Sequence, residues 1–376
     1  MRCGIDRLVK SKLFYITLIL IASGCTESEN KKNTSNYEEL VVKVPAKIQQ
    51  FDHIDSLYYS FLGLNSFATD EGGVILPIWG PATLVKTNRD GNEVLAKTAE
   101  GRGPGELMDV GVPTMGENEI YVYDQNLQKI VIFDREDLSL IEEFLVGSHQ
   151  EYRVDRAYPT FEKGSLLLEL SNSQLVVDKM DDKLLIKYDL ENEEYGESIA
   201  LKGKLYAPLG DLINGRAGTA MMVPFSDSQF IVAAPERRSL LLYDTRTDLI
   251  AEINADFDTL RTISVDLPTE EISSTEKDSI KAEVEGFHTG DWGDVESLLP
   301  EVKAGADNML FNNDKIWLKS NLRGSGDIWL VLNMEGEITD LVSLPKDTFL
   351  THVSEHHLGV RLDEANFALY ENPVGD

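Results

Sequence analysis

Residues suited to binding a partner gather in two glycine-rich stretches of the last third of the chain. They are Phe287, His288, Trp292, Trp317 and Arg323. Aromatic side chains beside glycines are typical of recognition loops, because one buried Trp can supply much of an interface's binding energy. We therefore predict that these residues bind a partner. The alternative is that Trp292 and Trp317 only fill the packing between elements.

The sequence contains none of the familiar catalytic motifs. It has no Gly-x-Ser-x-Gly, no His-Glu-x-x-His and no phosphate-binding Gly-x4-Gly-Lys. Asn88, Asp90 and Asn92 alternate like the ligands of a calcium loop. However, Gly91 comes one place early, and Ala99 stands where the twelfth-position Glu is required. We predict a hairpin turn here and no metal site.

Another glycine-rich stretch, earlier in the chain, comprises Gly101, Gly103 and Gly105. Its spacing differs from that of a dinucleotide-binding loop, and no helix pattern follows it. We predict a tight connection between strands, in which Glu106 accepts hydrogen bonds from backbone N–H groups. The alternative is a ligand-binding loop in which Arg102 and Glu106 contact the ligand.

The N-terminus has the pattern of an export signal. Basic residues precede an apolar run from Leu13 to Ala22, which is too short to span a bilayer as a helix. The segment Ile21-Ala22-Ser23-Gly24-Cys25 then resembles a bacterial lipobox, where cleavage leaves a lipid-modified cysteine. We predict a lipoprotein signal peptide over 1–24, lipidation of Cys25 and a flexible polar tether over 25–36. The alternative is a plain secretory signal.

Charge and cysteine content exclude several functions. The formal net charge of the 376-residue chain is -30, and a surface so acidic repels phosphate backbones, so no nucleic-acid partner is expected. It also disfavours self-association, so we expect a monomer. The two cysteines are Cys3, which would leave with the signal, and Cys25. A mature chain without a free thiol has neither disulfides nor a cysteine nucleophile.

Pairs of short runs with alternating apolar and polar residues recur along the chain. Successive pairs are about 40 to 55 residues apart, except for one longer gap. The second run of each pair is 84–88, 130–134, 185–189, 240–244, 329–333 and 367–371. Such pairs predict six β-hairpins, and repeats of this length are typical of β-propeller blades. The sequence thus predicts an all-β fold, a six-bladed β-propeller over 37–376. We expect the run Val41–Val44 to complete the last blade, because an open ring would leave unpaired edges.

The longer gap contains an insertion over 256–305, between blades four and five. Within it, Ser273 and Glu276 fit a capping box, and Ile280, Val284 and Phe287 follow at helical spacing. We predict one short helix that docks its apolar side on the propeller, because an isolated helix of that length is marginal in water. The alternative is an acidic loop.

Part of the chain resembles a known family. The segments 88–107, 120–126 and 131–134 resemble an NHL-type repeat, and the chain is similar to six-bladed propeller lipoproteins of Bacteroidetes. The resemblance returns at 299–301 and 316–318. It implies a six-bladed, TolB-like propeller in a family whose members are assumed to bind rather than catalyse.

Two functions follow from these observations. The first is a non-catalytic binding or scaffold module for a protein or glycan partner, carried by an outer-membrane lipoprotein on its periplasmic or cell-surface face. The second is a channel-centred metal-dependent hydrolase or lyase of the lactonase type. Related propellers with acidic ligands that point into the channel hydrolyse small esters. No cofactor is expected for the first function, and calcium is possible for the second. We favour the binding module.

Overall fold

The structure is a computed structural model that describes residues 37–374, except 52, 55–56, 59–61, 64, 70–71, 148, 173–179, 210–211, 214–215, 218–219 and 288–289. The predicted signal peptide (1–24), the tether (25–36), Cys25 and His288 lie outside the described residues.

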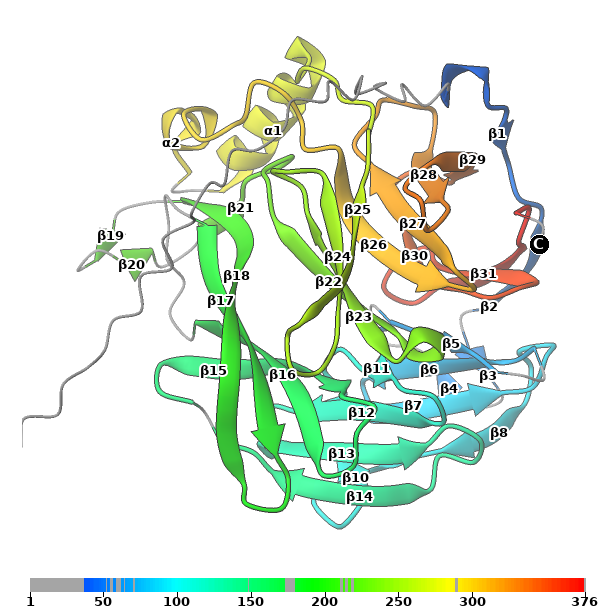
Figure 1. Cartoon of the computed structure of the whole chain (residues 1–376). Coiled ribbons are helices and arrows are strands. Elements are labelled where there is room, and N and C mark those ends of the chain that lie inside the picture. Colours follow the sequence, from blue (N-terminus) through cyan, green and yellow to red (C-terminus); the bar gives the residue numbers. More distant parts are fainter. Residues whose placement is uncertain are drawn as a thin grey trace, which may run out of the picture. The chain divides into compact units, whose positions relative to one another are not determined.

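Six sheets of four or five strands account for most of the described residues (Figure 1). The first contains β5 (Phe67–Ala68), β6 (Val74–Trp79), β7 (Ala82–Thr87) and β8 (Val94–Lys97). The second contains β11 (Thr114–Met115), β12 (Glu119–Asp124), β13 (Lys129–Asp134) and β14 (Leu140–Leu145). The third contains β15 (Tyr152–Pro159), β16 (Ser165–Asn172), β17 (Met180–Asp189), β18 (Glu194–Pro208) and β21 (Ala220–Met222).

The remaining three large sheets follow in chain order. The fourth contains β22 (Gln229–Ala234), β23 (Ser239–Asp244), β24 (Leu249–Ile253) and β25 (Thr259–Ser264). The fifth contains β26 (Ala306–Asn312), β27 (Lys315–Ser320), β28 (Asp327–Leu332), β29 (Ile338–Leu344) and β1 (Val42–Lys43). The sixth contains β30 (Phe349–Val353), β31 (His357–Arg361), β32 (Phe367–Glu371) and β2 (Lys47–Phe51).

Smaller elements connect these sheets. Three two-stranded sheets pair β3 (His53–Ile54) with β4 (Leu57–Tyr58), β9 (Ala99–Glu100) with β10 (Glu106–Leu107), and β19 (Leu212–Ile213) with β20 (Arg216–Ala217). Two 3-10 helices are η1 (Tyr37–Glu39) and η2 (Pro235–Arg237).

The six predicted strand pairs are antiparallel hairpins at the centre of the six sheets: β6–β7, β12–β13, β16–β17, β22–β23, β27–β28 and β31–β32. Central strands are apolar on both faces, because each sheet is covered on both sides. All six residues of β7 are buried, whereas most of the outer strand β14 is exposed.

The large sheets pack in a cyclic order. Six hydrophobic clusters each join two large sheets. Five of them join sheets that follow in chain order: first to second, second to third, third to fourth, fourth to fifth, and fifth to sixth. The remaining cluster joins the sixth back to the first, through Phe367 and Leu369 against Leu76 and Ile78. Small antiparallel sheets that bury their faces only against neighbours are the architecture of a β-propeller.

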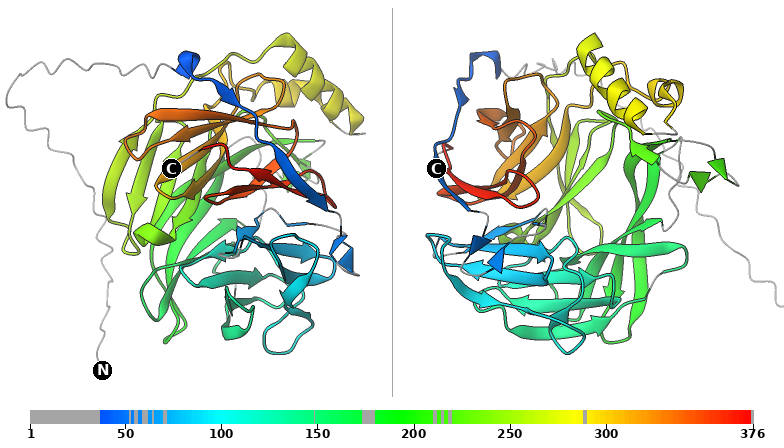
Figure 2. Two further views of the ribbon diagram at one scale, coloured as in Figure 1. Left: turned by 90° about the vertical axis from the view of Figure 1, so that its right-hand side faces the viewer. Right: turned by 180° about the vertical axis from the view of Figure 1, so that it is seen from behind.

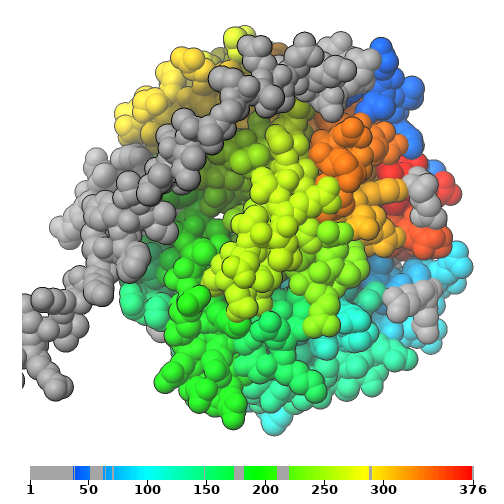
Figure 3. Space-filling view, in the orientation of Figure 1, coloured from blue at the N-terminus to red at the C-terminus, as the bar shows by residue number. Residues whose placement is uncertain are grey.

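The N-terminal strands differ from the sequence prediction. The run Val41–Val44 does not complete the last sheet, because β1 pairs in parallel with β29 at the edge of the fifth sheet. The strand that completes the sixth sheet is β2, which pairs antiparallel with β32 (Figure 2). The space-filling view shows the N-terminal residues, in blue, against the orange and red C-terminal segments (Figure 3). Val41 and Val44 are mostly exposed, so little apolar burial favours their pairing with the last sheet.

In the sequence, two helices lie between the fourth and fifth sheets. Helix α1 (Ser274–Gly286) begins at Ser273, and the capping box of Ser273 with Glu276 is present. Helix α2 (Trp292–Glu296) follows, with Asp291 as its N-cap. The segment outside the sheets runs from 265 to 305, because residues 259–264, which the sequence placed in the insertion, form β25.

Candidate functional site

The insertion, residues 265–305, is docked on the third sheet (Figure 1). Ile280 and Val284 of α1 and Val295 of α2 are buried in one hydrophobic cluster with Ala207 of β18 and Val223, which follows β21. Burying Ile280 and Val284 stabilises the helix by roughly 1.5 to 3 kcal/mol per side chain. The insertion is therefore a packed part of the fold, with a fixed position relative to the third sheet.

A buried lysine ties the insertion to the fifth sheet. The side chain of Lys303 is 1% exposed, and its Nζ lies 2.5 Å from Glu276 Oε1 and 3.4 Å from Glu270 Oε2. It also donates to the carbonyl oxygen of Asn321, just after β27, at 3.1 Å. Burial alone would raise the pKa of Glu276, but the hydrogen bonds from Lys303 and Ser273 and the charge of Lys303 lower it to about 2.

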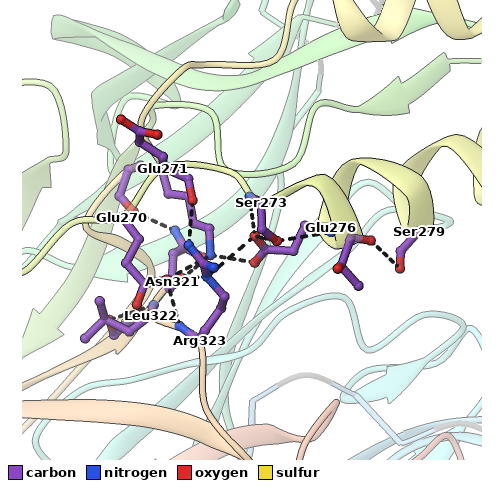
Figure 4. A network of polar contacts seen from close by, with 12 residues as sticks. Glu270, Glu271, Ser273, Glu276, Ser279, Asn321, Leu322 and Arg323 are labelled. Carbon is purple, nitrogen blue, oxygen red and sulfur yellow. Dashed lines mark hydrogen bonds and ion pairs between the residues drawn. The ribbon is translucent and has the colours of Figure 1, made fainter.

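Arg323 belongs to the same network (Figure 4). Its Nε donates to Glu270 Oε2 at 2.8 Å, and Nη2 donates to the carbonyl oxygen of Glu271 at 3.0 Å. The side chain is nevertheless 51% exposed. Arg323 thus helps to hold the insertion and still presents part of its guanidinium to solvent. We call Lys303, Arg323, Glu270 and Glu276 the latch.

The predicted aromatic residues of the insertion have different environments. Phe287 is the C-cap residue of α1 and is 43% exposed, so it is not part of the buried side of the helix. Trp292 is half-buried and packs against the cluster that docks the insertion. Trp292 therefore contributes to packing, whereas Phe287 is available at the surface.

The glycine-rich loop has the local structure expected from its residues. Glu106 Oε2 accepts a hydrogen bond from the backbone N–H of Gly103 at 2.7 Å. A β-carbon at position 101 would collide with the Glu106 carboxylate, which explains the glycine there. Arg102 is exposed. This loop joins β9 to β10, between the first and second sheets in chain order, and the structure does not place it with the latch residues.

The turn at 88–92 also has the predicted form. Gly91 adopts a φ of 64°, and the Asn88 side chain accepts from the backbone N–H of Asn92 at 3.1 Å. These hydrogen bonds close a hairpin turn between β7 and β8. Across the described ranges, no group of three His, Cys, Asp or Glu side chains is arranged to hold a metal ion.

Trp317 lies in the core between the fifth and sixth sheets. It is 1% exposed and packs in the cluster that joins those sheets. It also forms part of the wall of a cavity of about 250 Å³, together with Asn312, Asn313, Glu355 and other residues. Trp317 therefore lies in a different cluster from Trp292 of the insertion.

The sequence did not indicate a set of charged residues that lies near the insertion. They are Lys204 on β18, Asp307 on β26, Lys319 on β27, Asp327 on β28 and Arg361 on β31, which we call the charged cluster. Asp307 follows the insertion directly, and Lys204 precedes the β18 residues that pack on its helices. No local pattern could have found the set, because its members stand on five strands of three sheets.

The charged cluster contains one ion pair and three cation–ring contacts, one of which is Lys319 Nζ at 6.0 Å from the Phe349 ring centroid. Lys319 Nζ lies 3.3 Å from Asp327 Oδ2, and both side chains are largely buried. The Arg361 guanidinium lies 4.5 Å from the ring centroid of Phe349. Lys204 Nζ lies 4.6 Å from the ring centroid of Phe230. Lys319 and Arg361 thus share the Phe349 ring of the sixth sheet, and Lys204 contacts the fourth sheet.

The part of the chain that the structure describes has no helix long and apolar enough to cross a bilayer. A scan against protein-family models and a search of curated proteins find no match for the sequence. Among solved structures, the chain is similar to a putative exported protein from Bacteroides fragilis, with a TM-score of 0.51 and 12% identity over 90% of this chain and 97% of that one. It also matches a DUF4221-family member from Bacteroides vulgatus, with a TM-score of 0.47 and 12% identity over 89% and 97% of the two chains.

A third match is the β-propeller domain of Cps50 from Myceliophteria thermophila, with a TM-score of 0.40 and 9% identity over 87% of this chain and 99% of that one. At these identities, the likeness to the Bacteroides fragilis protein concerns the fold alone. It agrees with the all-β fold of many small sheets described above.

Proposed function

We propose that this chain is a lipid-anchored β-propeller of the cell envelope that binds a protein or glycan partner and does not catalyse a reaction. The binding surface is the end of the sheets that carries the insertion. The observation that carries the proposal is Phe287, which is 43% exposed at the end of a helix that is fixed to two sheets. A large aromatic side chain on a rigid support binds a partner at little cost in conformational entropy.

We infer that the six large sheets are six blades of one propeller, closed by β2. The cyclic packing of the sheets and the pairing of β2 with β32 support this inference. The end that carries the insertion then lies at one mouth of the ring. The lipobox-like segment that ends at Cys25 supports the anchoring.

The test is a capture experiment with the wild-type chain and the Phe287→Ala variant. Each is immobilised, and the retention of envelope proteins and of glycans released from the envelope is quantified. We expect Phe287→Ala to lower retention of the partner by about tenfold or more, because exposed aromatic anchors dominate interface energy. Its melting temperature should stay close to that of the wild type, since the side chain is not in the core.

The matched control is Leu145→Ala, which removes an apolar side chain that is 73% exposed on the second sheet. It should retain the partner as the wild type does. Equal retention by Phe287→Ala and the wild type would exclude Phe287 and its surroundings as the binding surface. A partner lost by both variants would show that general surface hydrophobicity, and not the insertion, is responsible.

A further inference from the structure

A cavity of about 450 Å³, which we call the inter-sheet cavity, lies between the second and third sheets. The second sheet contributes a row of side chains, because Tyr121 of β12 is opposite Ile132 of β13, which is opposite Glu142 of β14. The third sheet contributes the turn between β15 and β16, residues 160–164, and Leu166. The inter-sheet cavity shares no residue with the insertion, the latch or the charged cluster, so it is a separate candidate site.

Part of the cavity wall is apolar. Ile132 and Leu166 are 7% and 2% exposed, and both belong to the cluster that joins the second and third sheets. Tyr121 is half-buried and packs against the same cluster. Burial and the charge of Glu119 raise the pKa of the Tyr121 hydroxyl to about 12, so this side chain is uncharged at neutral pH. The wall therefore offers a fixed apolar surface to the hydrocarbon part of a ligand.

The charged side chains of the wall are mostly acidic. They are four carboxylates and two cations: Glu117, Glu119, Glu142, Glu162, Lys163 and Arg238. Lys187 Nζ lies 3.3 Å from Glu162 Oε2 and 2.7 Å from Asp256 Oδ1, so counting this lysine and this aspartate together leaves the negative excess unchanged. Among the described residues, the other three glutamates of the wall have no ion-pair partner. A concave surface with an excess of one charge concentrates ligands of the opposite charge.

The arrangement of the carboxylates favours an organic cation over a metal ion. Within the described residues, no three acidic or histidine side chains are placed to hold a metal ion. A calcium ion requires its oxygen ligands at about 2.3 to 2.6 Å, whereas an ammonium group accepts carboxylates at hydrogen-bond distance and from separate directions. An ammonium group can also lie against the face of an aromatic ring such as that of Tyr121.

We propose that the inter-sheet cavity binds a small aliphatic amine, whose ammonium group pairs with Glu119 and Glu142 and whose hydrocarbon chain packs on Ile132. Both parts of the ligand are needed, because the carboxylates attract any cation and only the apolar wall distinguishes an alkylammonium from a simple ion. This inference goes beyond the proposed partner-binding function. It assigns a small-molecule site on residues that the capture experiment with Phe287→Ala does not change.

The test is isothermal titration of the purified protein with cadaverine, 1,5-pentanediol and Mg²⁺ at about 0.15 M salt, which screens exposed charges. Cadaverine and Mg²⁺ carry the same charge, and pentanediol has the carbon chain of cadaverine without the charge. We expect cadaverine to bind at one site, and the two other compounds to bind at least about tenfold more weakly, because each lacks one of the two contacts. Absence of cadaverine binding, or equal binding of Mg²⁺ or pentanediol, would overturn the proposal.

The decisive variant is Glu119→Gln, with Glu283→Gln as its matched control. Glu119 is half-buried in the cavity wall, whereas Glu283 is exposed on α1, so both variants lose one negative charge and only the first changes the cavity. We expect Glu119→Gln to weaken cadaverine binding by about tenfold, and Glu283→Gln to bind as the wild type does. Unchanged binding by Glu119→Gln, or an equal loss in both variants, would overturn the proposal.

A purely structural role for Glu119 predicts a different result. Neutralising one of several neighbouring carboxylates should leave the melting temperature of Glu119→Gln unchanged or raise it, whereas loss of a structural carboxylate would lower it. Glu142→Gln, on the exposed outer strand β14, should also weaken cadaverine binding, so it tests the site even if Glu119→Gln is misfolded. Phe287→Ala should bind cadaverine normally, which separates failure of this proposal from failure of the proposed function.

Discussion

Lys303 shows how one residue can fix a functional element. Its ammonium group is buried, and it contacts two carboxylates of the insertion and one carbonyl oxygen next to the fifth sheet. A buried ion pair is a weak source of net stability, but loss of one partner leaves an uncompensated buried charge. The latch therefore specifies where the insertion sits, in addition to the apolar packing that holds it.

The first prediction concerns the pH dependence of the latch. Glu276 has a pKa of about 2 in the folded chain, below its ordinary value of 4.5, so the fold favours the ionised carboxylate. Its stabilisation is complete above about pH 5 and is lost as the pH falls toward 2. We expect Glu276→Gln to be less stable than the wild type by roughly 2 kcal/mol at pH 7, with the difference shrinking as the pH falls.

Chemical denaturation of both proteins between pH 7 and pH 3 measures this difference. The matched control is Glu283→Gln, an exposed glutamate on the same helix, which should follow the wild type at every pH. A stability difference for Glu276→Gln that is constant across this range would contradict the role of its ionisation.

At the scale of elements, alternation in the sequence predicted the central hairpins well. The strands β13 (Lys129–Asp134) and β23 (Ser239–Asp244) are bounded by turn residues, and neighbouring sheets cover both of their faces. The capping box at Ser273 likewise predicted the start of α1 from local residues alone. These features depend on contacts within a few residues or within one hairpin, and local sequence encodes them directly.

Features that depend on distant contacts could not be predicted in this way. The run Val41–Val44 and the run Lys47–Phe51 have similar patterns, and only the position of β32 decides which one completes the sixth sheet. Lys204 and Phe230 have no common local pattern, because they meet through the packing of the third sheet against the fourth. Trp317 could be a surface or a core residue until β28 and the sixth sheet are placed around it.

The second prediction tests the closing strand. A chain whose tether is joined to Ala46 lacks η1 and β1, and one joined to the residue after Phe51 also lacks β2. We expect the second truncation to lower the melting temperature by more than about 5 °C relative to the first, because it leaves the edge of β32 unpaired.

Differential scanning calorimetry of the two truncations measures this effect, with the full chain as reference. The first truncation should lower the melting temperature less, because β1 forms only two residue pairs with β29 and only Tyr37 and Leu40 of the removed segment pack on the core. If both truncations melted at the same temperature, β2 would not be the strand that stabilises the ring.

At the scale of the whole molecule, the third prediction concerns anchoring. The chain has two cysteines, and only Cys25 follows the lipobox-like residues. We expect the wild-type protein in the membrane fraction, extractable by detergent, and Cys25→Ser as a soluble or unprocessed protein, because the lipid chains would be lost. Cell fractionation followed by immunoblotting measures the distribution.

The matched control is Cys3→Ser, which changes the other cysteine inside the predicted signal. It should fractionate with the wild type. A wild-type protein that is fully soluble after export would refute the lipid anchor and leave a secreted binding module.

The pairing of β2 with β32 also determines when the fold can be completed. Residues 47–51 are synthesised more than 300 residues before their partner strand, Phe367–Glu371. Until then, β2 cannot join the sixth sheet, and the packing of Phe367 and Leu369 against the first sheet is missing. Contacts so far apart in sequence form slowly, and the incomplete intermediate exposes strand edges. A ribosome that stops before residue 367 therefore leaves a chain in which β2 has no partner strand in the sixth sheet.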